Sequence, residues 1–151
     1  HKVNMELKIT ILEHGPKNIP QYATNGSAGI DIEAAIAKPI NIHAGKRALI
    51  PTGLKLEIPT DHEIQIRPRS GLALKYGITV LNSPGTIDSD YRGEVGVILI
   101  NHSNESFQIN PLDKVAQMVI TKIIKVNIIK KNILSETKRG TGGFGSTGGE
   151  Q

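Results

Sequence analysis

The stretch MELKITIL, residues 5–12, alternates apolar and polar side chains. Side chains of a β-strand point to opposite faces in turn, so this period of two predicts a strand with one buried face. The same alternation recurs in GLKLEIP (53–59) and HEIQIRP (62–68). The runs YRGEVGVILIN (91–101) and KVAQMVITKII (114–124) are longer and rich in branched residues, which predicts strands covered on both faces.

Turn-forming clusters separate these runs at intervals of about 8–12 residues. They are EHGPKNIP, TNGSAG, HAGKR, IPTD, NSPG, NHSNES and NPLD. One short stretch, SGLALKYG (70–77), predicts a helical turn or two, with Ser70 as N-cap and Gly77 as the stop. The sequence therefore predicts an all-β sandwich or barrel with one short helix.

Composition narrows the class of protein. A chain of 151 residues with 38% hydrophobic and 21% charged residues fits one globular domain. The absence of cysteine excludes disulfides, thiolate metal sites and cysteine nucleophiles, and it is compatible with a reducing compartment. No apolar run approaches the ~18 residues of a membrane span, and the first residues lack the apolar core of a signal peptide. Neither a membrane nor a secretory role is expected.

The net charge of +4 could favour a polyanion or only reflect a solvated surface. The lysines of TKIIKVNIIKK (121–131) punctuate apolar pairs, which predicts a strand with lysines on its wet side rather than a nucleic-acid-binding stripe. His14, His43, His62 and His102 have no metal-ligand spacing, and no role is assigned to them.

One candidate anion site lies in IRPRSGLALKYG (66–77). Arg67 and Arg69 share a face if the chain is extended there, and the N–H groups near Ser70 and Gly71 can bind phosphate. A capped helix beside a surface arginine explains the same residues. Two further polar groups interrupt apolar strands. Asp31 in AGIDI (28–32) either faces water or pairs with Arg67 or Arg69, and Gln117 in DKVAQMV (113–119) either faces outward or needs partners for its amide.

The segment LNSPGTIDSDYRGE (81–94) predicts a hairpin between two apolar strands. Asp88 and Asp90 share a face if extended, with the ring of Tyr91 beside them. An ionised carboxylate on a rigid hairpin can accept a proton from an attacking water or hold a magnesium-bound water. An Asx-turn with exposed aspartates is the simpler alternative.

The glycine-rich end, KRGTGGFGSTGGEQ (138–151), contains one of only two phenylalanines in the chain. Its backbone N–H groups can wrap an anion, but no Lys-Ser/Thr pair follows the glycines as in a Walker A loop. A linker is the alternative interpretation.

Taken together and in this order, AGIDI, RPRSGLA (67–73), GTIDSDYRG (85–93), DKVAQMV and RGTGGFGSTG (139–148) resemble the trimeric deoxyuridine triphosphatase (dUTPase) family. The resemblance implies an all-β, distorted jelly-roll subunit with one short helix, a β domain over 5–137 and a flexible C-terminal arm over 138–151. It implies a homotrimer whose arms close shared active sites, with no stable nucleic-acid binding, in the cytoplasm or another compartment that metabolises nucleotides.

The resemblance also implies an activity, namely Mg²⁺-assisted hydrolysis of dUTP to dUMP and pyrophosphate, which limits uracil in DNA and supplies dUMP for thymidylate synthesis. Asp88 would activate the water that attacks the α-phosphorus, and Asp31 would reach Mg²⁺ through water. The substrate contacts implied are Arg69, Ser70, Gly71, Asn82, Gly85, Thr86, Ile87, Tyr91, Gly96, Gln117, Arg139, Phe144, Gly145 and Ser146.

Two positions depart from the family pattern. Ile30 stands where an aromatic residue is frequent, and Leu112 where a glycine commonly precedes Asp113. dCTP deaminase is a related alternative, but its deaminating glutamate would fall at Ile98. A non-catalytic nucleotide-binding module on the same scaffold would be favoured by a lost Asp88 or a lost arm, and both are present. A generic jelly-roll binding protein would leave the five matches unexplained.

Overall fold

The computed structural model describes residues 5–146 and 148, and within them the chain forms ten strands and one helix. In chain order they are β1 (Lys8–Ile11), β2 (Ile30–Glu33), β3 (Ile40–Ile42), β4 (Arg47–Glu57), β5 (His62–Arg67), α1 (Ser70–Tyr76), β6 (Ile78–Val80), β7 (Gly85–Ile87), β8 (Glu94–Asn101), β9 (Phe107–Ile109) and β10 (Lys114–Lys122).

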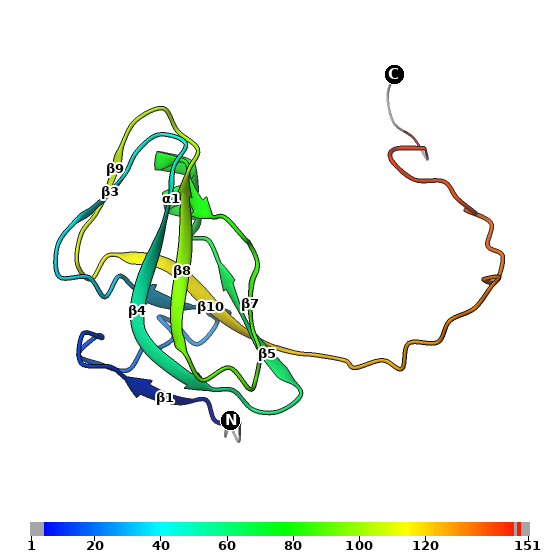
Figure 1. The fold of residues 1–151 in the computed structure, drawn as a ribbon, viewed down its shortest axis with the longest axis horizontal. Helices are drawn as coiled ribbons and strands as arrows, with labels where there is room; N and C mark the ends of the chain where they lie inside the picture. The colour runs from blue at the N-terminus through cyan, green and yellow to red at the C-terminus, as the bar shows by residue number, and fades with distance from the viewer. Residues whose placement is uncertain (1–4, 147, 149–151) are drawn as a thin grey trace.

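These strands form two four-stranded sheets, β1-β4-β8-β6 and β2-β10-β5-β7, with a small ribbon of β3 and β9. The paired strands run antiparallel. In Figure 1, β4 and β8 run side by side and β10 crosses behind them. The architecture is the all-β sandwich that the turn spacing left as one of two alternatives, and it is jelly-roll-like, as the family resemblance implied.

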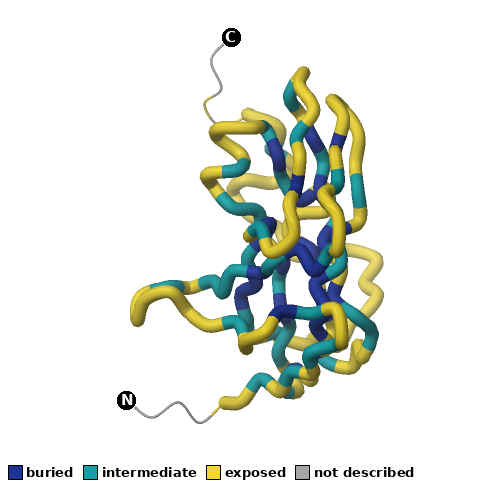
Figure 2. Tube along the Cα trace, turned by 90° about the vertical axis from the view of Figure 1, so that its left-hand side faces the viewer, coloured by how far each residue is buried: buried dark blue, intermediate teal, exposed yellow. Residues whose placement is uncertain are grey.

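The core lies between the sheets and is built from alternate residues of their strands. Leu54, Val97 and Leu99 bury their side chains from one sheet, and Ile64 and Met118 from the other. Figure 2 shows buried segments inside and exposed ones along the loops. This explains the period of two in the sequence, because every second side chain faces the opposite sheet.

Strand β8 is covered on one face within this chain, not on both as its apolar run predicted. Val95, Val97 and Leu99 are buried, whereas Ile98 and Ile100 are only half-buried. An apolar run predicts burial but does not say whether the covering surface belongs to the same chain.

The short helix α1 forms where predicted, but its first turn differs by one residue. Arg69, in an extended conformation, occupies the N-cap position without a side-chain capping bond, so Ser70 is the first helical residue rather than the cap. Gly77 ends the helix in the left-handed region, as predicted. This helix, the one formed by the described residues, is not long and apolar enough to cross a membrane.

The hairpin predicted around residues 81–94 is confirmed, with β6 and β8 as its paired arms. Val80 lies opposite Leu99, and the N–H of Leu81 donates to the carbonyl of Ile98. Beyond this point the arms separate, because β7 leaves for the other sheet and pairs with β5. The three residues of β7 are too short to be recognised from periodicity, so sequence reasoning did not find this exchange.

The strand predicted over 121–131 is wrong beyond Lys122. Residues 123–146 form no strand, and Ile124, Val126 and Ile128 are exposed together with the lysines. Among the described residues, the last main-chain hydrogen bond between this segment and the body runs from the N–H of Ile123 to the carbonyl of Asp61. A strand needs a neighbour for its hydrogen bonds, and none lies beside this segment. Figure 1 shows it running away from the sandwich.

Candidate active site

A pocket of about 220 Å³ lies between the separated arms of the hairpin. Its lining residues come from β7, the following turn and the start of β8: Thr86, Ile87, Asp88, Tyr91, Glu94, Val95 and Gly96. The structure therefore places most residues of the stretch GTIDSDYRG that were predicted as substrate contacts around one pocket, and Gly96 lines this pocket together with Thr86 and Ile87. Gly96 leaves room for the side chain of Leu49 on β4, since a Cβ at position 96 would lie 2.7 Å from Cδ1 of Leu49.

Asp88 lies at the mouth of this pocket on a tight turn. The N–H of Tyr91 donates to the carbonyl of Asp88 at 3.1 Å, which closes the turn. The side chain of Asp88 is exposed and makes no hydrogen bond or ion pair with the residues described. Asp90 does not line the pocket, because the turn replaces the extended chain in which both aspartates would share a face.

Tyr91 borders the pocket and is held in two ways. Its hydroxyl donates to the carbonyl of Glu94 at 3.0 Å. Its ring lies against Gly93, where an added Cβ would come within 2.3 Å of the Tyr91 hydroxyl oxygen. Glycine at position 93 is thus required for this position of the ring.

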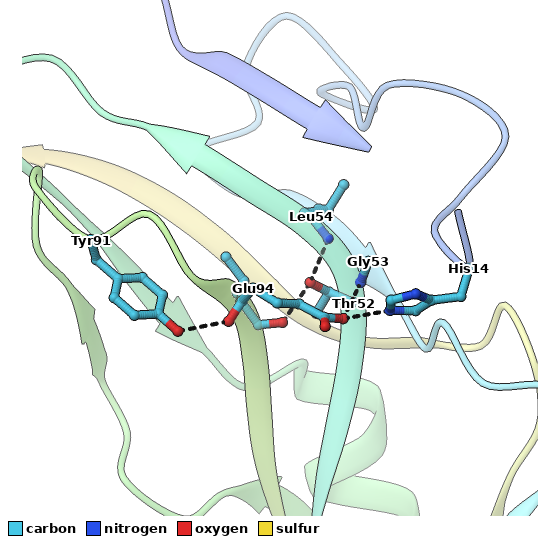
Figure 3. A network of polar contacts seen from close by, with 7 residues as sticks. His14, Thr52, Gly53, Leu54, Tyr91 and Glu94 are labelled. Carbon is cyan, nitrogen blue, oxygen red and sulfur yellow. Dashed lines mark hydrogen bonds and ion pairs between the residues drawn. The ribbon is translucent and has the colours of Figure 1, made fainter. Parts of the chain in front are cut away.

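The carboxylate of Glu94 joins the pocket to β4 and to the N-terminal loop, as Figure 3 shows. Its Oε2 accepts from the N–H of Gly53 at 2.9 Å and bonds Nε2 of His14 at 2.7 Å. Burial alone would raise the pKa of Glu94, but the bonds from His14 and Gly53 and the charges of His14 and Lys55 outweigh it, and the pKa is lowered.

A second group of predicted residues lies along the sheet β2-β10-β5-β7. Gln117 on β10 lies opposite Asp31 on β2 and opposite Arg67 on β5. Its amide nitrogen donates to the carbonyl of Pro68 at 3.0 Å. Gly29 makes room for this amide, since a Cβ there would lie 2.1 Å from Oε1 of Gln117. The stretches AGIDI, RPRSGLA and DKVAQMV therefore come together through the pairing of β10 with β2 and β5.

Asp31 pairs with Arg69, which settles the alternative left open by the sequence. Nε of Arg69 lies 3.1 Å from Oδ1 of Asp31, and Nζ of Lys114 lies 3.8 Å from Oδ2. Arg67 instead donates twice to Oε1 of Gln65. The two arginines thus have different partners, with Arg67 at the end of β5 and Arg69 at the N-cap of α1.

Ser70 and Gly71 follow Arg69 in the first turn of α1. A Cβ added at Gly71 would meet no atom within 4 Å, so the main chain is approachable there. Asn82 and Gly85 line neither the hairpin pocket nor the hollow beside Arg69. Gly85 is buried opposite Ile66, and a Cβ added to it would lie 3.5 Å from the amide nitrogen of Asn82.

The two groups do not share one pocket in this single chain. The hairpin pocket contains neither Arg69 nor Gln117, and Arg69 instead lines a hollow with Leu72 and Tyr76.

The arm residues lie apart from both groups. Nε of Arg139 donates to the carbonyl of Gly142, and the N–H of Ser146 donates to that of Gly143, so these bonds are local turns. Phe144 is fully exposed, and Gly145 follows it in the left-handed region. Residues 147 and 149–151 of the predicted arm lie outside the described residues. The structure therefore brings none of the described arm residues to either group.

A metal would find few protein ligands here. Across residues 5–146 and 148, no cluster of three or more His, Asp or Glu side chains is placed to hold a metal ion. Asp31 is a single carboxylate, already shared by two cations. This donor set fits a Mg²⁺ ion held chiefly by a phosphate chain, which is how Mg²⁺ commonly binds.

Sequence reasoning missed Glu94, His14, Gly53 and Gly93. Glu94 and His14 are 80 positions apart and share no local pattern. Gly93 had a weak signal, a glycine two residues after a tyrosine in a turn. Gly53 breaks the alternation of GLKLEIP at its first residue and adopts φ 68°.

Fold and site together define a jelly-roll-like all-β protein with a pocket between splayed hairpin arms, a separate acidic–basic cluster and a glycine-rich arm. The family model described as dUTPase matches residues 16–148. The chain belongs to the dUTPase family.

Known proteins of the family resemble this chain over nearly its whole length. The deoxyuridine 5'-triphosphate nucleotidohydrolase of Chlamydia pneumoniae is 57% identical over 131 residues, 86% of this chain and 90% of that protein. The fold is similar to that of a Staphylococcus bacteriophage 80alpha dUTPase mutant with dUpNHpp, at a TM-score of 0.85, 22% identity and coverage of 97% and 99% of the two chains. A dUTPase mutant from phage phi11 of S. aureus, solved to show coordination of a structural Mg(II) ion, has a TM-score of 0.77 at 22% identity, with 87% and 99% covered.

Proposed function

We propose that this protein hydrolyses dUTP to dUMP and pyrophosphate. The observation that carries the proposal is the pocket between β7 and β8, which has an unpaired carboxylate, Asp88, at its mouth and belongs to a chain of the dUTPase family. The relatives named deoxyuridine 5'-triphosphate nucleotidohydrolase support it. The reaction consumes one water and forms dUMP and pyrophosphate, so its product feeds thymidylate synthesis and its substrate is removed before uracil enters DNA.

The pocket would take the uracil ring. β7 is the edge strand of its sheet, so main-chain groups of Gly85, Thr86 and Ile87 that do not pair with β5 remain available to a base. Uracil presents N3–H as a donor between two carbonyl acceptors, and the amide of Asn82 adds a further partner. Cytosine presents a different pattern, and a buried mismatch leaves polar groups unpaired. The narrow space between β7 and Gly96 would exclude the thymine methyl group.

Tyr91 would contact the deoxyribose. Its ring borders the pocket beside Asp88, where a sugar attached to the bound base must pass. A ring packed against C2′ leaves no room for a ribose hydroxyl. Selection of deoxyribose over ribose would therefore depend on where the ring stands.

The phosphates would bind Arg69, Ser70, Gly71 and Gln117. Arg69 uses Nε on Asp31, while Nη1 makes only a long 3.4 Å contact with the carbonyl of Lys114. Its outer guanidinium nitrogens are thus able to donate to phosphate oxygens. Mg²⁺ would be held by the triphosphate and by Asp31 through water, and when bound it supplies neutralisation of the developing negative charge.

Asp88 would act as the general base. It accepts a proton from the water that attacks the α-phosphorus, and the bond from that phosphorus to the bridging oxygen breaks to release pyrophosphate. A carboxylate is a weak base, so most of the acceleration must come from the donors that stabilise the charge of the transition state.

The arm over 138–151 would close the site through Arg139 on the γ-phosphate, Phe144 on the uracil ring, and Gly145 and Ser146 along the phosphates. Ordering about ten residues costs roughly 10–20 kcal/mol, whereas one base–aromatic stack returns only ~1–3 kcal/mol. The stack cannot hold the arm alone, so Arg139 and the glycine N–H groups must contribute, and they do so only with a triphosphate bound.

A homotrimer with shared sites explains why the pocket, the Arg69 group and the arm lie apart in one chain. The segment before the arm exposes apolar side chains that a second copy can cover: Ile124, Val126, Ile128, Ile129, Ile133 and Leu134. The body would then comprise residues 5–137. Sedimentation should give a mass about three times 16.3 kDa.

Pyrophosphate release from dUTP, dCTP, dTTP and UTP tests the activity directly. We expect Mg²⁺-dependent turnover of dUTP and little turnover of the other three. Comparable rates for dCTP and dUTP, or release of ammonia, would contradict the proposal and favour a deaminase, although Ile98 stands where that chemistry requires a glutamate.

A further inference from the structure

Glu94 connects three separate parts of the molecule. Its carboxylate accepts the N–H of Gly53 from the irregular stretch of β4, where the register with β8 shifts between Pro51 and Lys55. The same oxygen bonds His14 of the N-terminal loop at 2.7 Å. The side chain of Glu94 is only 31% exposed, so these bonds are partly shielded from water. Both sequence-distant contacts therefore fix residue 94 against the body.

The backbone of Glu94 in turn fixes Tyr91. The tyrosine hydroxyl donates to the Glu94 carbonyl, while Gly93 leaves the space into which the ring settles. The next residue is held as well, because Thr52 donates to the carbonyl of Val95 at 2.6 Å. Figure 3 shows this chain of contacts running from His14 through Glu94 to the Tyr91 ring. The Glu94 carbonyl is thus held both by the pairing of Glu94 with Lys55 of β4 and by the bonds of its own side chain.

We propose that Glu94, held by His14 and Gly53, is a positioning residue for Tyr91 and thereby sets how strongly the pocket selects deoxyribose over ribose. The inference rests on the proposed function. Glu94 need not touch the reacting atoms, because it acts on the ring through its own carbonyl. Loss of its carboxylate removes the side-chain bonds and leaves only strand pairing to hold residue 94, so its carbonyl and the Tyr91 ring can shift away from the sugar.

The test compares kcat/KM for dUTP with kcat/KM for UTP in Glu94→Ala. We expect this ratio to fall about three- to tenfold, the effect of one weakened hydrogen bond. The ratio of dUTP to dCTP reports base recognition and should change less than about twofold. Glu94→Gln keeps an acceptor for Gly53 and should restore most of the selectivity. Glu57→Ala, which removes a carboxylate from the exposed Lys8–Glu57 pair, is the matched control.

A double-mutant cycle with Tyr91→Phe separates positioning from general loosening. If both changes act through the bond from the hydroxyl to the Glu94 carbonyl, the double variant loses no more selectivity than the worse single variant. If the loss of selectivity in the double variant equals the product of the two single losses, the proposal is overturned. An equal fall in the dUTP/UTP and dUTP/dCTP ratios of kcat/KM would also overturn it. His14→Ala changes only an exposed loop residue and should give a smaller loss of about two- to threefold, so the test does not depend on the folding of Glu94→Ala.

A measurement without substrate keeps this inference apart from the proposed activity. The chain has three tyrosines, so ring resonances can be assigned by substitution. Glu94→Ala should shift the Tyr91 ring signals and leave those of Tyr22 and Tyr76 in place. If wild type fails to prefer dUTP over UTP, the proposed function fails. If wild type is selective and neither the ratio nor the ring signals change in Glu94→Ala, the positioning role fails.

Discussion

Ile120 and Ile128 belong to one stretch, ITKIIKVNIIKK (120–131), in which lysines punctuate apolar residues, yet they lie in opposite environments. Ile120 packs against the core from β10, which has β5 beside it along that part of its length. Ile128 is 88% exposed on a segment with no neighbouring strand. The same type of side chain is thus packed against the core where its strand has a hydrogen-bonded neighbour, and is exposed where the main chain has none.

The same contrast separates the two kinds of candidate site residue. Gln117 and Asp31 are placed by strand register, so their geometry exists in the free chain. Arg139 and Phe144 are placed only by local turns. The body therefore supplies a preformed surface, and we propose that the arm groups take up a fixed position only when a ligand binds them. Substitutions in the two regions should separate stability from turnover.

The largest expected effect belongs to the body. Asp88→Asn should lower kcat for dUTP by about 10²–10⁴-fold, because the water loses its proton acceptor. The melting temperature and the binding of dUpNHpp should stay close to those of wild type, since the side chain is exposed and unpaired.

Asp90→Asn provides the comparison for that change, because Asp90 lies in the same turn but outside the pocket lining. Its loss of turnover should be at least about tenfold smaller. Equal losses from both variants would show that the charge of the turn matters rather than one base.

The two phenylalanines sharpen the comparison of body and arm. Phe107 is half-buried and packs on Tyr76 with ring centroids 4.9 Å apart. Phe107→Ala should lower the free energy of unfolding by roughly 2–4 kcal/mol. Phe144→Ala should leave it unchanged while reducing kcat/KM for dUTP about tenfold, through the lost stack. Thermal unfolding and steady-state kinetics of both variants check this, and a large loss of stability in Phe144→Ala would contradict the account.

A smaller effect concerns pH and Glu94. Its pKa is lowered in the folded protein, so its contribution to stability is present above the ordinary value near 4.5 and is lost as the pH falls through the lowered pKa. At neutral pH, Glu94→Ala should cost about 1–2 kcal/mol of unfolding free energy, and the difference from wild type should shrink in acid below that value. Denaturant titrations across pH 3–7 measure it, with exposed Glu57→Ala as the nearly flat control.

The smallest effect is expected at Leu112, where the family commonly has glycine. Leu112 adopts φ 70°, a conformation that costs a residue with a Cβ about 1–2 kcal/mol. Because the side chain is 60% exposed, Leu112→Gly should stabilise the protein by about 0.5–1 kcal/mol net of chain entropy. The same change at exposed Leu74 in α1 should instead destabilise it by about 1 kcal/mol. Stability losses at both positions would contradict the strain argument.

Much of the body could be predicted from the sequence. Alternation identified most of the long strands, and the apolar runs around NSPG identified the hairpin. The pairing of Asp31 with Arg69 was one of three alternatives that residue type alone left open, beside pairing with Arg67 and exposure to water. The exchange of β7 into the second sheet was not predictable, because three residues carry no period.

The misses share a physical cause. Periodicity reports which face of a segment is apolar, but it does not report what covers that face. The strand predicted beyond Lys122 is wrong for this reason. The bond between His14 and Glu94 joins distant positions through the packing of β4 on the N-terminal loop, and no local pattern encodes it. The cap at Arg69 differs by one residue because helix ends are set by local geometry as much as by residue type.

The central claim is that body and arm form a working site only between copies of this chain. Co-expression of Asp88→Asn with a variant truncated after residue 137 tests it most directly, because each is expected to be inactive alone. If one copy supplies Asp88 and another the arm, random mixing in a trimer should restore about a quarter of wild-type dUTP turnover. Mixed oligomers with no activity above that of the separate variants would show that each site is completed within one chain, and would contradict the account.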